Sequence, residues 1–411
     1  MFNKSFIRVS PLLLISLIAV SMTGVPIFRN FFQMGDLLPQ TNAATADGSS
    51  VSVADYDKLK GCTNDTSKKP NSIEYLTYFN CGRVSIDKDN GTVTREFTLV
   101  AEENQNVTIS TKGHWLPGWT FNGTIPGPTM RMTEGDHVKI TLINSKDSKH
   151  SHSLHMHSIH PSTMDGVESG IVAPGESYVY DFIASPFGLY PYHCHVEPIQ
   201  DHINRGLYGM MIIDPKTPRP QMKEMVMLMN GYDLNLDQEG PFEIPKPGQF
   251  KDLDTAEDRD NELYSVNGVA FEYVDHPIPL KVGEPVRIYL VNMLEFDRVN
   301  SFHLHGNMFN YYPSGTSTTP EDYNDIVTLS PGDRGIIEFT PQYTGRYMFH
   351  AHQAEFAAKG WMGFFDVTND GISSATTTTN STASQSGVMQ GMATMLQDDD
   401  NATKSFLSFN N

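Results

Sequence analysis

The chain has 411 residues, of which 39% are hydrophobic and 19% are charged, and its formal net charge is −19 at pH 7. This length suffices for two domains that each bury a hydrophobic core. The negative charge argues against a nucleic-acid partner, because such a partner requires a basic surface. Acidity alone indicates a soluble surface and identifies no partner.

The N-terminus has the composition of an export signal. Lys4 and Arg8 precede an apolar stretch that runs from Pro11 to about Phe28. A basic segment followed by an apolar one is typical of a secretory signal. At about 18 residues the stretch is also near the lower limit for a membrane-spanning helix. Residues 1–28 therefore fit either a cleaved signal peptide or an N-terminal membrane anchor, and we expect a secreted or extracytoplasmic protein.

Three cysteines are present, at Cys62, Cys81 and Cys194. Outside the cytoplasm an odd count suggests one disulfide and one cysteine with another role. Cys62 and Cys81 lie close in sequence among polar loop residues, and we expect them to pair within an N-terminal extension or linker, residues 29–91. Cys194 lies between two histidines and is expected to carry chemistry.

From Val93 onward the sequence consists of short alternating runs broken by turn residues. Examples are Val138–Ile143 and Ser177–Phe182, and Gly-Pro or Pro-Gly pairs recur between such runs. Short strands at this spacing, with no long helical pattern, favour an antiparallel β-sandwich or barrel. The chain is therefore expected to be all-β.

The β-rich pattern occurs twice. Residues 122–213 run through Asn-Gly, a strand, a histidine cluster, Pro-Gly, a strand and a second histidine cluster, and residues 267–367 repeat that order. Two copies of one unit is the economical interpretation. Prolines cluster at Pro215–Pro220, which places domain 1 at residues 92–217 and domain 2 at residues 218–370.

The C-terminal tail, residues 371–411, is rich in Thr and Ser, then bears methionines and ends in an acidic segment. This composition is typical of a disordered, low-complexity segment. Met389, Met392 and Met395 are spaced three apart. They fit either soft thioether ligands for Cu(I) or one face of a short amphipathic helix.

Ten of the fifteen histidines fall in four short clusters: His152, His155 and His157; His193, His195 and His202; His303 and His305; His350 and His352. Residues i and i+2 of a strand point to the same face, so each His-x-His pair aims two imidazoles in one direction. In His193-Cys194-His195 the cysteine then points to the opposite face. The thiolate and the flanking imidazoles would serve separate metal sites joined by a short covalent path.

His152, Cys194 and His202 supply two imidazoles and one thiolate. With a weak axial ligand this is the blue-copper arrangement. Leu207 follows His202 by five residues, where a methionine would be expected, and leucine cannot coordinate. We therefore expect a three-coordinate site with a raised reduction potential. The alternative axial residues lie slightly further along the chain, at Met210 and Met211.

The other eight clustered histidines are too many for one metal ion of ordinary coordination number. They suit a three-copper cluster in which one copper has two ligands and each of two others has three. Their sequence positions divide them equally between the two repeats.

The motifs resemble those of the multicopper oxidase family over residues 92–367. The segments that carry the resemblance are Phe121–Pro128, His152-x-x-His155-x-His157, His193-Cys194-His195, Phe302–Gly306 and His350-x-His352. The resemblance implies two consecutive cupredoxin-like Greek-key β-sandwiches and four coppers per chain. It implies that His152, Cys194 and His202 hold a type 1 copper and that His155 and His303 hold a type 2 copper. The implied ligands of the type 3 pair are His157, His193, His195, His305, His350 and His352.

The layout departs from that of three-domain laccases. The chain has two domains, its cysteine lies in the first, and more residues separate Cys194 from His202 than in laccases. It resembles two-domain oxidases with the blue copper in domain 1, which are related to copper nitrite reductases. This resemblance implies a homotrimer in which domain 1 of one chain meets domain 2 of the next, so that the cluster lies between subunits.

The implied reaction couples four one-electron oxidations of a small reductant to the reduction of O₂ to two waters. Electrons would enter at His202 and pass through Cys194 to His193 and His195. A phenol, a metal ion and a small nitrogen compound remain open as reductants.

Oxygen reduction also consumes protons, which carboxylates near the cluster would relay. The candidates are Asp165, shortly after His157, and Glu355, just past His352. The alternative for each is an ordinary turn or surface carboxylate.

Two other functions remain open at this point. A copper nitrite reductase needs only three histidines at its type 2 copper, so it would not need both histidine pairs of domain 2. A non-enzymatic electron carrier would use the blue site alone. Copper content and oxygen uptake distinguish the three.

Overall fold

The computed structural model describes residues 69–234 and 260–372, together with short pieces at 43–44, 50–51, 57 and 61–63. The export segment, residues 1–28, and most of the tail, including its three methionines, lie outside the described residues. Among the described residues, no helix is both long and apolar enough to cross a membrane.

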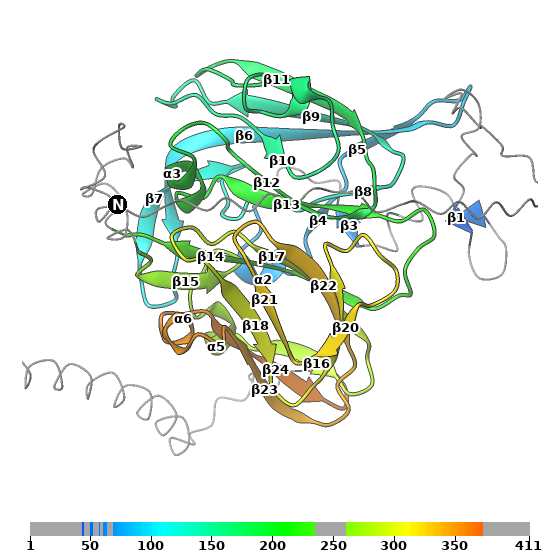
Figure 1. Ribbon diagram of the computed structural model, residues 1–411, viewed down its shortest axis with the longest axis vertical. Coiled ribbons are helices and arrows are strands. Elements are labelled where there is room, and N and C mark those ends of the chain that lie inside the picture. The colour runs from blue at the N-terminus through cyan, green and yellow to red at the C-terminus, as the bar shows by residue number, and fades with distance from the viewer. Residues whose placement is uncertain are drawn as a thin grey trace, which may run out of the picture. The chain divides into compact units, whose positions relative to one another are not determined.

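Domain 1 is a sandwich of two sheets, drawn in blue to green in Figure 1. The strand order of the first sheet is β10 (His155–Met156), β12 (Gly188–His193), β13 (Tyr208–Asp214), β8 (Met130–Thr133), β4 (Phe79–Asn80) and β3 (Cys62–Thr63). The order of the second is β11 (Ser177–Ile183), β9 (His137–Asn144), β6 (Val93–Thr108) and β5 (Arg83–Ile86), with β7 (Trp115–Phe121) paired to β6.

Domain 2 repeats this plan, in green through yellow to orange (Figure 1). One sheet has the order β15 (Leu263–Val266), β14 (Lys223–Tyr232), β17 (Val286–Asn292), β22 (Arg334–Phe339), β19 (Phe309–Pro313) and β20 (Asp322–Asn324). The other has the order β16 (Ile278–Lys281), β24 (Met362–Thr368), β23 (Gly345–His350), β18 (Asn300–Leu304) and β21 (Ile326–Leu329). The prediction of an all-β chain with two β-sandwiches is confirmed.

Helices are short and lie in connections: α2 (Ser72–Tyr75), the 3₁₀ turn η1 (Ser162–Met164), α3 (Ile199–Asn204), α5 (Glu272–Asp275) and α6 (Ala354–Ala358). The sheets are not purely antiparallel as expected, because β6 runs parallel to β9, β8 to β13 and β14 to β17. Greek-key connections bring strands together that are not consecutive in the chain, and some of these neighbours run parallel. The local alternation that identified the strands carries no information on those pairings.

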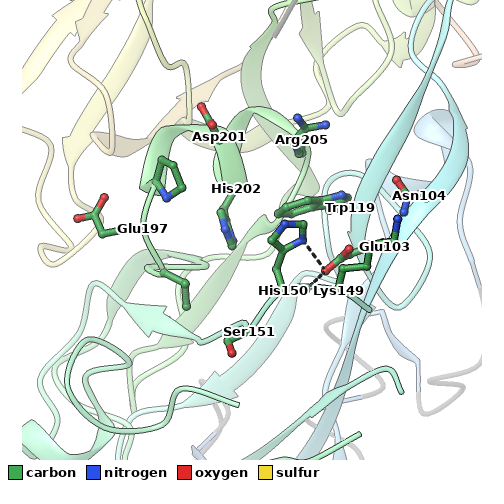
Figure 2. A pocket seen from close by; sticks show the side chains of 12 residues that line it. Glu103, Asn104, Trp119, Lys149, His150, Ser151, Glu197, Asp201, His202 and Arg205 are labelled. Atoms are coloured by element: carbon green, nitrogen blue, oxygen red, sulfur yellow. Dashed lines mark hydrogen bonds and ion pairs between the residues drawn. The ribbon is translucent and has the colours of Figure 1, made fainter. Parts of the chain in front are cut away.

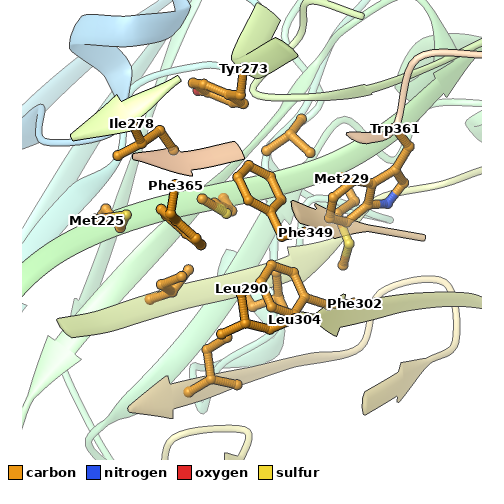
Figure 3. Close-up of a cluster of buried hydrophobic side chains, with 14 of the residues drawn as sticks. Met225, Met229, Tyr273, Ile278, Leu290, Phe302, Leu304, Phe349, Trp361 and Phe365 are labelled. Atoms are coloured by element: carbon orange, nitrogen blue, oxygen red, sulfur yellow. The ribbon is translucent and has the colours of Figure 1, made fainter. Parts of the chain in front are cut away.

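Each sandwich has its own hydrophobic core, and a third core lies between the two. Figure 3 shows the domain 2 core, where Phe302, Phe349, Trp361 and Phe365 pack between the sheets. The third core combines residues of β13, such as Met210, with residues of β14, β17 and β22. This arrangement explains why β13 and β14 are apolar on both faces and why the two sandwiches belong to one compact unit.

Buried charges also join the two sandwiches. The guanidinium of Arg131 in domain 1 contacts Asp214 at 2.9 Å and Glu224 at 2.6 Å, and Glu224 also contacts Arg287 of domain 2 at 2.8 Å. Arg287 completes the network with Glu338 at 2.6 Å. Such a network is costly to desolvate, but removing one member takes away part of the compensation of the buried charges that it contacts. It therefore fixes how domain 1 meets domain 2.

The N-terminal extension is fastened to domain 1 at two places. Cys62 and Cys81 form the predicted disulfide, with their Cα atoms 5.6 Å apart. Arg95 of β6 contacts Asp57 of the extension at 2.9 Å and Asp136 of the sandwich at 2.5 Å. These contacts complete the edge of the sheet that carries β3 and β4.

Candidate metal centres

His152, Cys194 and His202 converge inside domain 1 and define the candidate blue-copper centre. Each side chain is almost completely buried, with 2% or less of the residue exposed. The Cys194 Sγ atom lies 3.1 Å from His202 Nδ1 and 3.8 Å from His152 Nδ1. The three donor atoms lie within 4.8 Å of one another, as one bound ion requires.

Three separate elements deliver these side chains. His152 lies in the connection before β10 and is held by a β-bridge to Val172. Cys194 directly follows β12, and its N–H donates to the Leu207 carbonyl at 3.0 Å. His202 lies near the end of α3. The extra residues between Cys194 and His202 thus form a helix that carries His202 back to the thiol.

Burial sets the protonation states at this centre. It raises the pKa of the Cys194 thiol to about 11. It lowers the pKa of His152 to about 4 and that of His202 to about 3, so both imidazoles are neutral at pH 7. Two neutral imidazoles and a thiol that loses its proton on metal binding are the donor set of a blue-copper site, and copper fits them.

Leu207 lies beside this centre, as the axial prediction requires. It is fully buried in the same core cluster as Cys194, and its N–H donates to the His202 carbonyl at 3.1 Å. Of the two alternatives, Met210 belongs to the core between the sandwiches, whereas Met211 belongs to the domain 1 core. The axial role of Leu207 stays a prediction.

His155, His157, His193 and His195 form the first histidine group. His155 of β10 pairs in register with His193 at the end of β12. The Nε2 atoms of His157 and His193 lie 3.1 Å apart, and the ring centroids of His155 and His195 lie 5.0 Å apart. The group therefore gathers on the face of the strand opposite the Cys194 thiol, as the alternation predicted.

His303, His305, His350 and His352 form the second histidine group, in domain 2. His303 of β18 pairs in register with His350 at the end of β23, and the Nε2 atoms of His305 and His350 lie 3.0 Å apart. The ring centroids of His303 and His352 lie 5.4 Å apart. The geometry repeats that of the first group, strand for strand.

Hydrogen bonds from the Nδ1 atoms to backbone carbonyls orient these imidazoles so that their Nε2 lone pairs face neighbouring rings. His193 Nδ1 lies 2.9 Å from the Cys194 carbonyl, and His350 Nδ1 lies 2.6 Å from the Ala351 carbonyl. An Nδ1–H that donates to a carbonyl leaves Nε2 as an unprotonated acceptor facing its partner ring. Burial and the neighbouring histidines lower the pKa of His193 to about 3, which opposes protonation. A bound metal ion satisfies such lone pairs.

Asp165 and Asp325 hold corresponding histidines of the two groups. The Asp165 carbonyl accepts from His155 Nδ1 at 2.9 Å, and the Asp325 carbonyl accepts from His303 Nδ1 at 2.9 Å. The Asp165 carboxylate also lies 3.2 Å from His155 Nδ1, beside the predicted cluster. Sequence reasoning missed Asp325, because it lies 22 residues after His303 whereas Asp165 lies 10 after His155.

Glu355, the second predicted proton relay, lies on α6. Its carboxylate is 65% exposed and pairs with Lys359 at 2.8 Å. The structure thus gives it the contacts of a surface carboxylate, and its relay role stays an untested prediction.

Domain 2 contains no counterpart of the candidate blue-copper centre among its described residues. Ala351 occupies the position that Cys194 has in domain 1, since each residue follows a histidine at the end of a strand. The Ala351 N–H donates to the Trp361 carbonyl, and the Cys194 N–H donates to the equivalent carbonyl of Leu207. The backbone N–H of Trp361 in turn donates to the Phe356 carbonyl, as that of Leu207 donates to the His202 carbonyl. Ala351 and Phe356 therefore occupy the positions of Cys194 and His202, and neither side chain can bind a metal ion.

A pocket of about 550 Å³ lies over the candidate blue-copper centre and reaches the edge of His202. Figure 2 shows Trp119 beside His150 and His202, and its ring centroid lies 4.8 Å from each of theirs. Glu197 and Asp201 from the α3 region and Arg205 also line the pocket. The pocket therefore brings open space to the buried His202.

Sequence reasoning missed Glu103, Trp119 and His150 in this pocket. A signal for Glu103 exists in the alternation of β6, where Leu99, Ala101 and Glu103 all occupy inward positions. An acidic side chain at an inward position is uncommon and marks a residue to inspect. No such signal exists for the other two, because their proximity to His202 depends on long-range packing.

Comparisons with known proteins agree with this geometry. Residues 102–218 and residues 241–371 each match a family model described as multicopper oxidase. A solved structure of a multicopper oxidase is 43% identical, with a TM-score of 0.64, covering 72% of this chain and 97% of that one. The copper nitrite reductase of Nitrosomonas europaea is 30% identical, with a TM-score of 0.58, covering 68% and 95% of the two chains.

Among curated relatives, the copper-containing nitrite reductase of Neisseria meningitidis is 30% identical over 57% of this chain, and the match spans 59% of that protein's length. The chain belongs to the multicopper oxidase family. Its fold is the two-domain cupredoxin-like form related to copper nitrite reductases, its implied cofactor is copper, and its class of activity is that of an oxidoreductase.

Proposed function

We propose that this protein is an oxidase that couples the one-electron oxidation of a small reductant to the reduction of O₂ to water. The balanced reaction takes four electrons from four reductant molecules and consumes four protons for each O₂, yielding two waters. The observation that carries the proposal is the second histidine group: domain 2 holds four converging imidazoles, whereas one type 2 copper shared with domain 1 would need fewer.

The proposed cofactor set is four coppers per chain. His152, Cys194 and His202 would hold the type 1 copper, with Leu207 as a non-coordinating axial residue, and the two histidine groups would hold the type 2 and type 3 coppers. When bound, copper at these sites supplies one-electron redox chemistry and an oxygen-binding centre. The chain supplies the connection between them, because Cys194 is covalently joined to His193 and His195.

The protein's own side chains also define the reductant and proton paths. His202 presents its ring edge to the pocket, so a reductant there would lie one imidazole away from the Cys194 thiolate. Asp165 holds His155 and lies at the first histidine group, where a carboxylate could pass protons from solvent.

We also propose that the three-copper cluster forms between two copies of the chain within a homotrimer. The donor atoms of His155, His157 and His193 form one compact set, and those of His303, His305 and His350 form another. His305 and His352 are exposed in the single chain. A head-to-tail contact between the two groups would complete the cluster and close into a ring.

Exposed apolar side chains accompany both histidine groups. Ile159 is 68% exposed and lies two residues from His157, and Met308 is 43% exposed and lies three residues from His305. Apolar residues around incomplete ligand sets are expected where a protein surface is covered on assembly.

We propose a secreted or extracytoplasmic location, anchored to the membrane if the N-terminal segment is retained. The Cys62–Cys81 disulfide supports this location, since disulfides persist in oxidising compartments.

The second candidate function is nitrite reduction, which the names of the curated relatives favour. Oxygen uptake by the copper-loaded protein, measured with ascorbate and a one-electron mediator, separates the two. An oxidase consumes O₂ and makes no nitric oxide from nitrite. Its oxygen uptake should be lost in the His202→Ala variant and kept in the His276→Ala variant. His276 is a suitable control because it pairs with Glu272 on α5, outside the described histidine groups. Nitric oxide formation without O₂ uptake would overturn the proposal.

A further inference from the structure

Glu103 places a buried carboxylate between the pocket and the candidate blue-copper centre. It lies on β6, and its side chain is only 2% exposed. A buried carboxylate must be compensated, because desolvation strongly disfavours its charge. The partners that compensate it therefore indicate what the residue does.

All of its described compensation comes from the segment that carries the ligand His152. Glu103 Oε1 accepts from the His150 N–H at 2.9 Å and lies 3.2 Å from His150 Nδ1 and 3.1 Å from His152 Nε2 (Figure 2). These partners, a backbone N–H and two imidazole nitrogens, are those of an ionised carboxylate, whose oxygens only accept hydrogen bonds. The carboxylate is thus an anion within hydrogen-bonding distance of a proposed ligand.

We infer that Glu103 is a positioning residue that fixes His152 as a ligand and lowers the reduction potential of the type 1 copper; the inference rests on the proposed function. The neutral His152 ring has one N–H. Donating it from Nε2 to Glu103 leaves the lone pair on Nδ1, the atom that faces Cys194 Sγ. An anionic acceptor also makes the imidazole a stronger donor, which favours Cu(II) over Cu(I).

The two sandwiches provide an internal comparison for this role. In domain 1 the Ser145 N–H donates to the Ala101 carbonyl of β6. In domain 2 the Met293 N–H donates in the same way to the Met229 carbonyl of β14, so Ala101 and Met229 occupy corresponding positions. Two residues further along each strand, domain 1 has Glu103 and domain 2 has Gly231. The sandwich without the ligand set therefore lacks the carboxylate as well.

Glu103 also opposes the effect expected of Leu207. A type 1 site without an axial sulfur has a raised potential, and a carboxylate bonded to one of its imidazoles lowers it. The pocket carboxylate Glu197 cannot substitute, because it is exposed and its described hydrogen bond goes to the N–H of Ile199 in its own turn. Glu197 therefore serves as the comparison carboxylate from the same pocket.

The test is a redox titration of the blue absorption band in the copper-loaded protein and its Glu103→Gln, Glu103→Ala and Glu197→Gln variants. Glu103→Gln keeps an acceptor for His152 and loses the charge, so the Cu(I)/Cu(II) ratio at fixed potential should rise about tenfold, which is about 59 mV for a one-electron couple. Glu103→Ala should also weaken and shift the blue band, because His152 is no longer held. Glu197→Gln should leave band and potential unchanged.

Equal potentials in Glu103→Gln, Glu197→Gln and the parent protein would overturn the inference and leave the proposed function intact. A parent protein with no blue band on copper loading would instead refute the type 1 site, and with it the proposed function. Far-ultraviolet circular dichroism of each variant shows whether it has folded, and Glu103→Gln is nearly isosteric, so the comparison does not depend on the alanine variant.

Discussion

The Sγ atom of Cys194 lies 3.1 Å from Nδ1 of His202, and the intervening residues fold into α3 so that the two side chains meet in the core. On the other side of the same strand end, the ring of His193 belongs to the first histidine group. One short segment of chain thus serves two metal sites.

Replacing Cys194 by Ser should remove the blue absorption band and one copper per chain. Because Cys194 is the proposed link between the pocket and both flanking imidazoles, oxygen uptake should fall by more than about 100-fold. This exceeds the roughly 10- to 100-fold loss typical of replacing a residue that only orients a metal ligand. Absorption spectra and an oxygen electrode give the two readouts. A Cys194→Ser protein that keeps its blue colour would place the site elsewhere.

The metal-free protein should lose stability as the pH falls from 7 to 5. Burial lowers the pKa of His152 from 6.5 to about 4, so below pH 6.5 the unfolded chain binds more protons than the folded one and unfolding is favoured. His152 contributes about 3 kcal/mol to the free energy of unfolding, at about 1.4 kcal/mol per pKa unit. This contribution is complete above pH 6.5 and is lost as the pH approaches 4. Thermal unfolding of chelator-treated protein measures it.

The matched variant for this pH dependence is His202→Phe, which copies Phe356 of domain 2. The pKa of His202 is lowered to about 3, so its replacement should flatten the dependence of the melting temperature on pH. A steeper dependence in this variant, or a parent protein that becomes more stable between pH 7 and 5, would contradict the assigned protonation states.

Replacing Arg131 by Met should destabilise the protein by about 3–5 kcal/mol, because it removes the guanidinium that offsets the buried negative charges of Asp214 and Glu224. Chemical denaturation measures the loss. The control is Arg83→Met: Arg83 is 82% exposed and pairs with Glu96, so its loss should cost less than about 1 kcal/mol. Similar losses in both variants would mean that the network between the sandwiches contributes little.

Ile159→Asp should separate assembly from electron entry. If the apolar residues beside the first histidine group are covered in the trimer, a charge at Ile159 weakens assembly, while the candidate blue-copper centre within domain 1 keeps its ligands. Sedimentation should show monomers that remain blue but take up no oxygen. The control Ile183→Asp lies on β11 and is 52% exposed; it should remain trimeric. An Ile159→Asp protein that is trimeric and active would argue against this interface.

The sequence could predict which histidines come together with one another and with Cys194, because metal chemistry restricts residue type and spacing so strongly. His-x-His pairs on strands fix the side of the sheet, and the two repeats predicted two sandwiches. The pairing of Cys62 with Cys81 could be predicted because these two lie close in sequence among polar loop residues, whereas Cys194 lies between two histidines.

Other features could not be predicted, since they depend on contacts between distant segments. Glu103 reaches His152 only because β6 packs beside the connection that carries His152. Asp325 reaches His303 through a loop whose length differs from that of the corresponding loop in domain 1. Local alternation likewise identifies strands such as β6 and β9 but does not reveal that they run parallel. Tertiary structure decides these relationships.

The central claim is that the two histidine groups and the candidate blue-copper centre together hold four coppers per chain. Metal analysis of the copper-loaded, assembled protein, with protein concentration from amino-acid analysis, tests it most directly. The account predicts four coppers per chain in the oligomer, one of them blue. Two coppers per chain, one of them blue, would contradict it and would favour the nitrite reductase arrangement.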